Sequence, residues 1–220
     1  MRYFVANWKA NKDFDAVKRW INIFLKIYIP ADDMVIISPC YIYLAYLREW
    51  LRKYKLKNIF LASQDVSEFE GGSYTGEVSA NLLKGLVDFA IIGHSERRKN
   101  LNEDKNRIRR KIVLAVKYQI KPILCINKKE ELETDRDLNF IAYEPLSAIG
   151  TGNNLNLREA INFKKQINLD RKIKFLYGGS VNADNIKEYN NKEINGFLIG
   201  KASLDPVFFW QIIKNGRYRD

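Results

Sequence analysis

Short apolar runs of β type alternate with segments of helical periodicity along the whole of this 220-residue chain. This alternation is typical of a parallel sheet, because parallel neighbours need a crossover connection and a helix usually supplies it. The pattern predicts eight strands, at residues 3–7, 34–38, 59–62, 89–92, 122–126, 139–142, 174–177 and 196–199. Eight parallel strands suit a closed sheet, so the predicted fold is an α/β single domain, a (β/α)8 barrel of residues 1–220.

Most of the gaps between these strands have the period of an amphipathic helix. Helices are predicted at residues 14–28, 41–54, 105–118 and 156–167. The gap after the fifth strand is the exception, because residues 127–137 leave room for barely two helical turns. We therefore expect a barrel with a shortened helical segment after strand five. The barrel wall that this leaves exposed would be covered by local apolar residues or by another subunit.

The chain is basic, with 37 Lys and Arg against 26 Asp and Glu, a formal net charge of +11. The basic residues are interspersed with acidic ones, so neither nucleic acid nor a membrane is an expected partner. The densest basic run is formed by Arg107, Arg109, Arg110 and Lys111, in a predicted helix. We expect this run to be a solvated helix face.

The two cysteines, Cys40 and Cys125, lie in apolar stretches without a second Cys or His at metal-ligand spacing. The sequence therefore predicts reduced core cysteines, with no disulfide and no metal site. The amino-terminal residues have no apolar targeting segment, and no run of eighteen uncharged apolar residues follows. A cytoplasmic protein is the expectation.

Three reactive side chains directly follow predicted strands. Lys9 follows the first, His94, the single histidine, follows the fourth, and Glu144 follows the sixth and precedes a proline. An isolated Lys or His is more often solvated or structural than catalytic. In a (β/α)8 barrel, however, the carboxyl ends of the strands meet at one face, where active sites are built. We therefore expect a general base, a hydrogen-bond donor and an ammonium group to lie close together.

Glycine-bearing turns follow the last three predicted strands, at residues 150–152, 178–180 and 200–201. Glycine lets backbone N–H groups approach an anion, and the last two strands of a barrel commonly hold a phosphate. One such turn alone would indicate little, but three at these strands favour a phosphate site. Together with a base and two donors, this site suits proton abstraction next to a carbonyl, with stabilisation of an enediolate. This chemistry requires no cofactor, nucleophilic triad or metal.

Over essentially its whole length the sequence resembles the triosephosphate isomerase family. The matching motifs are NWKAN from Asn7, QDVS from Gln64, GSYTGE from Gly72, GHSERR from Gly93, AYEP from Ala142, AIGTG from Ala148 and YGGSV from Tyr177, with GKASL from Gly200 as a near match. The resemblance implies a TIM barrel that interconverts dihydroxyacetone phosphate and D-glyceraldehyde 3-phosphate through an enediolate. It also implies a role in glycolysis and gluconeogenesis and no cofactor.

The resemblance also implies roles for individual residues. Glu144 would shuttle the proton, while His94 and Lys9 polarise the substrate carbonyl. Asn7, Ser95 and Glu96 would support them. The phosphate would be held at Asn7, Lys9, Gly150, Ser180, Gly200 and Lys201, and residues 145–153 resemble a lid. The segment 64–77 resembles a loop that inserts into a partner subunit, with Thr75, Glu77 and Arg97 at the interface. A homo-oligomer is expected, with a dimer ahead of a tetramer.

The sequence departs from the family pattern at three places. Ser147 stands where the lid usually has Trp, Asn127 and Lys128 stand where strand five is usually followed by Gly-Glu, and Lys201 replaces a Gly of the phosphate site. In the family, that Trp and that Glu can meet when the lid closes, so the first two changes remove both partners of this contact. The third preserves the N–H but is incompatible with an unstrained positive φ, and it could add a cation.

Two other functions compete with this interpretation. Another phosphate-binding barrel enzyme, such as a phosphoribosyl isomerase or indole-glycerol-phosphate synthase, would explain the glycines but not His94, Ser95 and Glu96 together with Glu144. A non-catalytic barrel would have no need for Lys9, His94 and Glu144 together. Both alternatives predict no triose phosphate isomerisation in a coupled assay.

Overall fold

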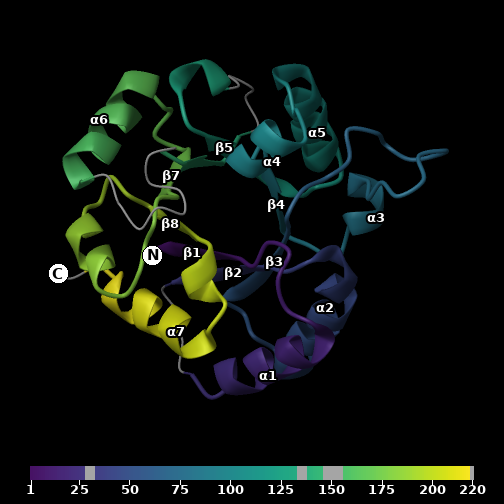
Figure 1. Ribbon diagram of the computed structural model, residues 1–220, viewed down its shortest axis with the longest axis horizontal. Coiled ribbons are helices and arrows are strands. Elements are labelled where there is room, and N and C mark those ends of the chain that lie inside the picture. Colours follow the sequence, from purple (N-terminus) through teal and green to yellow (C-terminus); the bar gives the residue numbers. More distant parts are fainter. Residues whose placement is uncertain (28–32, 133–137, 146–155, 219–220) are drawn as a thin grey trace.

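The protein is an eight-stranded parallel barrel, seen here in a computed structural model that describes residues 1–27, 33–132, 138–145 and 156–218. The strands are β1 (Tyr3–Asn7), β2 (Met34–Ser38), β3 (Ile59–Ser63), β4 (Phe89–Ile92), β5 (Lys121–Ile126), β6 (Phe140–Tyr143), β7 (Lys174–Tyr177) and β8 (Gly196–Ile199). β8 pairs with β1 and closes the sheet. Figure 1 shows the helices arranged in a ring around these strands. The predicted (β/α)8 barrel is confirmed, and no predicted strand end is displaced by more than one residue.

The described helices are α1 (Phe14–Phe24), α2 (Leu44–Tyr54), α3 (Ala80–Leu83), α4 (Ser95–Asn100), α5 (Lys105–Lys117), α6 (Leu157–Ile167) and α7 (Pro206–Asn215), with 3-10 helices η1 (Tyr41–Tyr43), η2 (Lys129–Glu131), η3 (Asn185–Tyr189) and η4 (Lys201–Ser203). The prediction of one helix over 14–28 is wrong at its end. After Phe24 the chain forms tighter turns, in which Lys26 N–H donates to the Ile23 carbonyl. The predicted helix 41–54 is instead a 3-10 turn followed by α2.

Polar side chains cap the starts of α1, α5, α6 and α7. Asp13 accepts from the Ala16 N–H at 2.7 Å and begins α1. Asn156 and Glu159 form a reciprocal capping box, so residue 156 precedes α6 instead of being its first residue. The carboxyl-terminal helix α7 has the same kind of signal, with Asp205 as its cap and Pro206 in its first turn. Our predicted ranges did not include α7, although this signal could have identified it.

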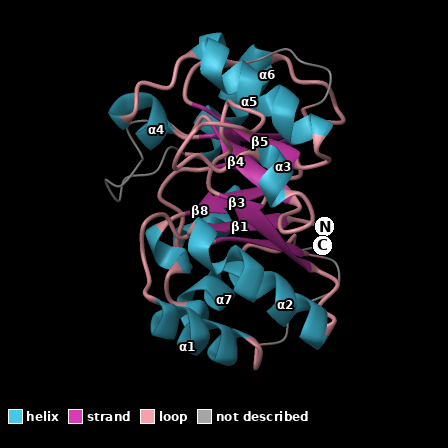
Figure 2. Cartoon of the chain, turned by 90° about the vertical axis from the view of Figure 1, so that its right-hand side faces the viewer, coloured by secondary structure: helices cyan, strands magenta, loops and turns pink. Residues whose placement is uncertain are grey.

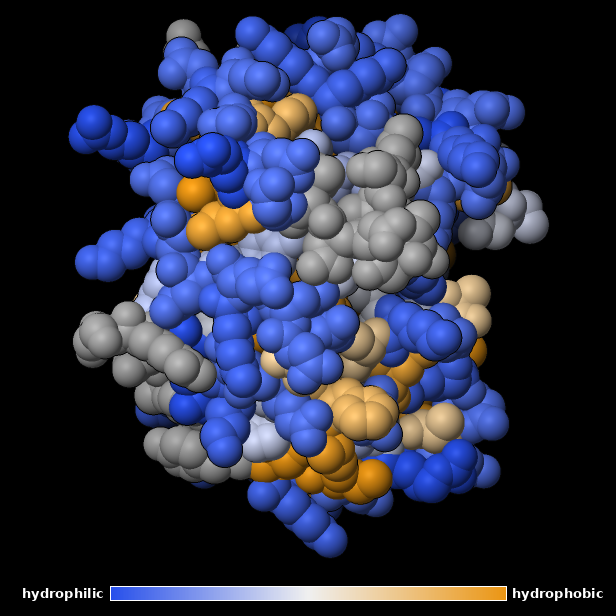
Figure 3. All heavy atoms as spheres, turned by 60° about the vertical axis from the view of Figure 1, so that its left-hand side comes forward, coloured by the Kyte–Doolittle hydropathy of each residue, from blue (hydrophilic) through white to orange (hydrophobic). Residues whose placement is uncertain are grey.

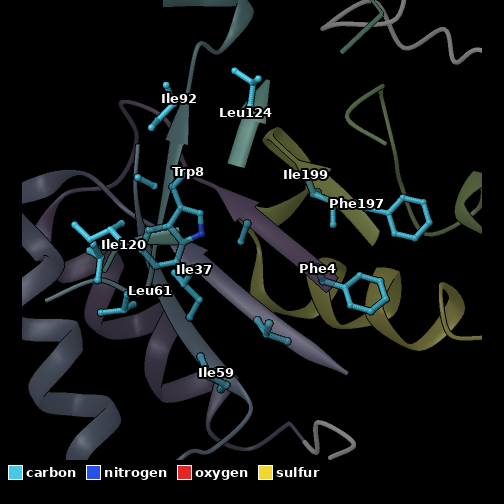
Figure 4. Packing of buried hydrophobic residues seen from close by; sticks show 14 of the residues in the cluster. Phe4, Trp8, Ile37, Ile59, Leu61, Ile92, Ile120, Leu124, Phe197 and Ile199 are labelled. Carbon is cyan, nitrogen blue, oxygen red and sulfur yellow. The ribbon is translucent and has the colours of Figure 1, made fainter. Parts of the chain in front are cut away.

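Side chains alternate between the two faces of the closed sheet. Along β1, Phe4 and Ala6 pack against the helices, whereas Tyr3 and Val5 point into the barrel. Figure 4 shows part of the outer layer, with residues from several strands around Trp8. Inside the barrel the Phe140 ring lies 4.9 Å from the Tyr3 ring. A Cβ on Gly196 would lie 2.2 Å from the Tyr3 carbonyl oxygen, so β8 can approach β1 here only with a glycine.

The short segment after β5 contains one 3-10 turn, η2, in its described part. We expected this shortening to expose the barrel wall, but every residue of β5 after Lys121 is buried. The neighbouring strand β6 is covered by the chain itself, where the Tyr143 ring stacks on Phe163 of α6 at 3.8 Å. Figure 2 shows the strands enclosed between α1, α2 and α7 below and α3, α4 and α5 above. The described wall therefore needs no second subunit.

The described helices are all too short or too polar to cross a membrane. The face seen in Figure 3 is mostly hydrophilic, and its apolar atoms gather chiefly toward the lower end, at the height of α1 and α7 in Figure 1. Cys125 is buried in the barrel as expected, but Cys40 is only partly buried.

Candidate active site

The carboxyl ends of the strands surround a pocket of about 750 Å³. Its lining includes Asn7 and Lys9 after β1, His94 after β4, Glu144 after β6, Gly178, Gly179 and Ser180 after β7, and Gly200 and Lys201 after β8. Residues as far apart in the sequence as Asn7 and Phe208 thus line one cavity. Gly150 and residues 146–153 of the expected lid lie outside the described part of the chain.

Glu144 is a buried carboxylate with partners on both oxygens. Its Oε1 lies 2.9 Å from His94 Nε2, and its Oε2 accepts from the Ser95 N–H at 3.0 Å. Its own N–H donates to the Ile126 carbonyl, which anchors it at the end of β5. Burial raises the pKa of Glu144, but the hydrogen bonds from His94 and Ser95 and the positive charge of Lys9 outweigh it, so the pKa lies below its ordinary value. Glu144 is therefore ionised at neutral pH and can accept a proton.

His94 is held in one tautomer by two neighbours. Its Nδ1 accepts from the Glu96 N–H at 3.2 Å at the start of α4, so Nδ1 carries no proton. Nε2 therefore carries the proton of the neutral ring and donates to Glu144. The imidazole is 6% exposed, so this donor is fixed by packing as well. A neutral imidazole that donates from Nε2 can hydrogen-bond a developing oxyanion.

Lys9 occupies a strained backbone position at the mouth of the pocket. Its φ is +52°, a left-handed value that costs free energy in a residue other than glycine. Two side chains hold it there: Asn7 Oδ1 accepts from the Lys9 N–H at 3.1 Å, and Gln64 Nε2 donates to its carbonyl at 2.9 Å. The ammonium pairs with Glu96. From the sequence, Gln64 was assigned only to the loop expected to insert into a partner subunit, and its contact with Lys9 was not predicted.

The glycine turns after β7 and β8 line the pocket beside Glu144 and Lys9. A Cβ on Gly179 would lie 2.2 Å from the Tyr177 hydroxyl oxygen, so this turn passes over the ring too closely for a side chain. Lys201 begins η4 and has no positive φ, so our concern about its backbone geometry does not apply. A Cβ on Gly200 would lie 3.8 Å from the Lys9 ammonium nitrogen. The β8 turn and Lys9 therefore face the same space.

The turn after β5, where Asn127 and Lys128 depart from the family pattern, is held by a side chain of its own. The Glu131 carboxylate accepts from the Asn127 N–H at 2.8 Å and from its side-chain amide at 2.9 Å. Glu131 also lies 3.8 Å from the Arg98 guanidinium. A carboxylate within η2 therefore organises the turn in which Asn127 and Lys128 replace the usual residues.

The three expected interface residues differ in their surroundings. Thr75 and Glu77 are exposed, whereas Arg97 lies 2.7 Å from Asp65 and 2.6 Å from Glu103. Lys111 contacts the same two carboxylates and is 2% exposed. Burial raises the pKa of Asp65 to about 6, although the charges of Lys111 and Arg97 oppose the rise. The expectation that the basic run is a solvated face is therefore wrong for Lys111, the counter-ion of a buried acidic pair.

The loop that carries Thr75 is tied to α5 by ion pairs. Arg107 and Arg110 both bind Glu68, and Lys117 binds Glu70. Beyond these anchors the loop extends away from the barrel, past α3 in Figure 1. Phe69 and Tyr74 stack at 3.8 Å there and are 36% and 45% exposed.

Comparison with known proteins gives a consistent result over the full chain. A sequence model of the family described as triosephosphate isomerase matches residues 2–216. A triosephosphate isomerase of Aquifex aeolicus is 35% identical, with 96% of this chain and 98% of that protein covered. Those of Finegoldia magna and Mycoplasma genitalium are 38% and 35% identical, with 97% and 98% of their own lengths covered.

Proposed function

The chain belongs to the triosephosphate isomerase family. We propose that Glu144, His94 and Lys9 carry out the isomerisation that gives this family its name. The chain is an isomerase that interconverts dihydroxyacetone phosphate and D-glyceraldehyde 3-phosphate, a step of glycolysis. The observation that carries the residue assignment is the 2.9 Å contact between the Glu144 carboxylate and His94 Nε2 in the pocket that Lys9 also lines. A coupled assay of the purified protein tests it, and an inactive folded enzyme would contradict it.

Glu144 is the base in this proposal. Its carboxylate removes a proton from the substrate carbon next to the carbonyl, and the electrons of the broken C–H bond move to the carbonyl oxygen. The product of this step is an enediolate, whose negative charge lies on oxygen. A proton also moves from the hydroxyl oxygen on the first carbon to the oxygen that carries the negative charge. Glu144 then returns its proton to the neighbouring carbon, which completes the exchange of ketone and aldehyde. No electron is gained or lost overall.

His94 and Lys9 act where the negative charge develops. The neutral imidazole donates from Nε2 to the substrate oxygen, and the Lys9 ammonium adds a positive charge nearby. In the free protein Nε2 instead donates to Glu144, so substrate replaces the carboxylate as the acceptor of this bond. The same exchange frees Glu144 Oε1 for the substrate proton.

The phosphate is assigned to the turns after β7 and β8. Ser180, Gly200 and Lys201 line the pocket from these turns, together with Asn7 and Lys9. The proposed ligands of the phosphate are the backbone N–H groups of the turns, with that of Gly150 as the fourth. The net charge of +11 favours capture of a doubly charged ester. The same proposal places the enzyme in the cytoplasm, where glycolysis takes place.

A crystal grown in sulfate is expected to hold the anion between Ser180, Gly200 and Lys201, near Lys9. The reason is that convergent N–H groups and ammonium groups favour an anion. An anion found repeatedly at Arg109, with this pocket empty, would contradict the phosphate assignment.

A homodimer is the proposed assembly. The support is the loop at residues 64–77, which the ion pairs of Glu68 and Glu70 anchor to α5 and which leaves Phe69 and Tyr74 36% and 45% exposed. Two stacked aromatic rings at the tip of a held loop are typical of a surface that a second copy covers. A tetramer is the alternative outcome of the same measurement.

Replacing Thr75 with Arg is expected to weaken assembly, because an unpaired buried charge costs about 3 kcal/mol or more, which raises the dissociation constant at least about 100-fold. Mass by analytical ultracentrifugation and specific activity are followed together during dilution. The control is Gln166→Arg, which adds the same charge to exposed α6 on the side of the barrel opposite the loop. A folded monomer with full specific activity would refute the proposal.

A further inference from the structure

Lys12 connects two loops that lie at opposite ends of the sequence. It follows Lys9 in the loop after β1, and its ammonium donates to the Leu204 carbonyl at 2.6 Å, a contact between residues 192 positions apart. The same nitrogen lies 5.2 Å from the centre of the Trp8 ring. This side chain therefore bridges the β1 loop and the turn after β8.

The bridged turn is the one that presents the proposed phosphate amides. η4 (Lys201–Ser203) follows Gly200, and Leu204 is its carboxyl-terminal cap. The last carbonyls of a helical turn have no partner within the turn and favour a cation, and Lys12 supplies one. Within the turn, the Ser203 hydroxyl donates to the Gly200 carbonyl at 2.7 Å. The position of Leu204 is thus transmitted to Gly200 through a short, hydrogen-bonded segment.

The backbone at Lys12 is unfavourable for a lysine. Its φ is +74°, a left-handed value that glycine adopts without steric cost. The Tyr43 hydroxyl donates to the Lys12 carbonyl at 2.9 Å and holds the residue in place. Burial lowers the pKa of Lys12, against the opposing charge of Asp205. The contacts of the Lys12 ammonium with the Leu204 carbonyl and the Trp8 ring offset the cost of the left-handed backbone and of burial.

We propose that Lys12 is a positioning residue for phosphate recognition, which holds the Gly200–Leu204 turn at the distance from Lys9 that the phosphate requires. The loop after β1 then contacts both ends of the Gly200–Leu204 turn, because the Lys9 ammonium faces Gly200 and Lys12 binds Leu204. Lys12 itself does not line the pocket within the described residues, so it acts through the turn and not on the substrate. The inference rests on the proposed phosphate site.

The test compares Lys12→Met with Lys18→Met in the full-length enzyme. Met keeps an unbranched chain and the same backbone cost, so the first variant removes only the ammonium. Lys18 also carries an ammonium beside an aromatic ring, 4.4 Å from Phe14, and pairs with Asp15 on the solvent-facing side of α1. Its replacement therefore reports the effect of net charge alone.

In Lys12→Met, the KM for D-glyceraldehyde 3-phosphate and the inhibition constant of inorganic phosphate are expected to rise about tenfold, the order expected for losing a hydrogen bond to a charged group. Activity toward D-glyceraldehyde, which lacks the phosphate, should stay within about twofold of wild type. Lys18→Met should leave all of these constants within about twofold. Lys12→Arg should recover most of the phosphate affinity.

A further variant separates positioning from folding. Lys12→Gly removes the ammonium but relieves the left-handed backbone, so it should be at least as stable as Lys12→Met and bind phosphate as weakly. A phosphate inhibition constant within twofold of wild type in Lys12→Met would overturn the inference. Equal losses with the phosphorylated and unphosphorylated substrates would overturn it too. An inactive wild-type enzyme would instead contradict the proposed function, and calorimetric titration with inorganic phosphate would still test Lys12.

Discussion

Replacing Glu144 with Gln is expected to lower kcat about a thousandfold while the barrel remains folded. A general base commonly contributes between about a hundredfold and ten-thousandfold, and an amide cannot take up the substrate proton. Gln has almost the same volume as Glu, so the buried site is not emptied. The measurement is kcat in a coupled assay with either triose phosphate.

A stability change should accompany this loss. Glu144 accepts one hydrogen bond from His94 and one from Ser95, whereas a Gln side chain offers one acceptor oxygen and one donor group. One of the two donors loses its partner, at a cost of about 1–3 kcal/mol. Thermal unfolding should therefore shift to lower temperature without loss of the native circular dichroism spectrum.

The Glu144→Asp variant provides a matched comparison. It retains a carboxylate but withdraws it by one methylene, and a misplacement of about 1 Å can cost about a hundredfold. An activity between those of wild type and Glu144→Gln would separate proton transfer from position. If Glu144→Gln keeps more than about a tenth of the wild-type kcat, a loss below about 1.4 kcal/mol, Glu144 is not the base.

Replacing His94 with Ala is expected to lower kcat by about a hundredfold to a thousandfold. That range is typical for the loss of one preorganised donor to an oxyanion. Binding of inorganic phosphate should change little, because His94 follows β4, which lies opposite β8 in the closed barrel. The two constants are measured separately, kcat by coupled assay and phosphate affinity by inhibition.

The pH profile of this variant gives a second readout. Burial raises the pKa of Glu144, and the hydrogen bond from His94 lowers it. Without His94 the pKa of Glu144 should rise, so the carboxylate is protonated at a higher pH than in wild type. When the solution is acidified, the activity of His94→Ala should therefore begin to fall at a higher pH than the activity of the wild type. The substrate phosphate titrates identically in both enzymes and cancels in the comparison.

If the activity of His94→Ala falls at the same pH as that of the wild type on acidification, the coupling between His94 and Glu144 is contradicted. His94→Gln serves as the conservative control, because its side-chain amide retains an N–H donor. Its kcat should exceed that of His94→Ala. Equal activity in both would indicate that the donor is not the feature that matters.

The strand positions and the main site residues were predictable from the sequence because they follow from local patterns. Apolar runs of fixed length placed β1 to β8 within one residue, and closure of the barrel then required the ends of β1, β4 and β6 to meet. Lys9, His94 and Glu144 follow those ends directly. Helix ends were less accurate, since α1 stops at Phe24 where tighter turns replace the regular hydrogen bonds.

The sequence alone thus determined the barrel, the family and the residues around the pocket, since periodicity and strand-end motifs are properties of neighbouring residues. Only the tertiary structure decided which partners those residues have. The tautomer of His94 depends on Glu96 and Glu144, and the burial of Lys111 depends on Asp65 and Glu103. The bond from Lys12 to Leu204 exists because closure of β8 on β1 brings their loops together. Distances and burial of this kind arise from the packing of distant segments, which no local pattern encodes.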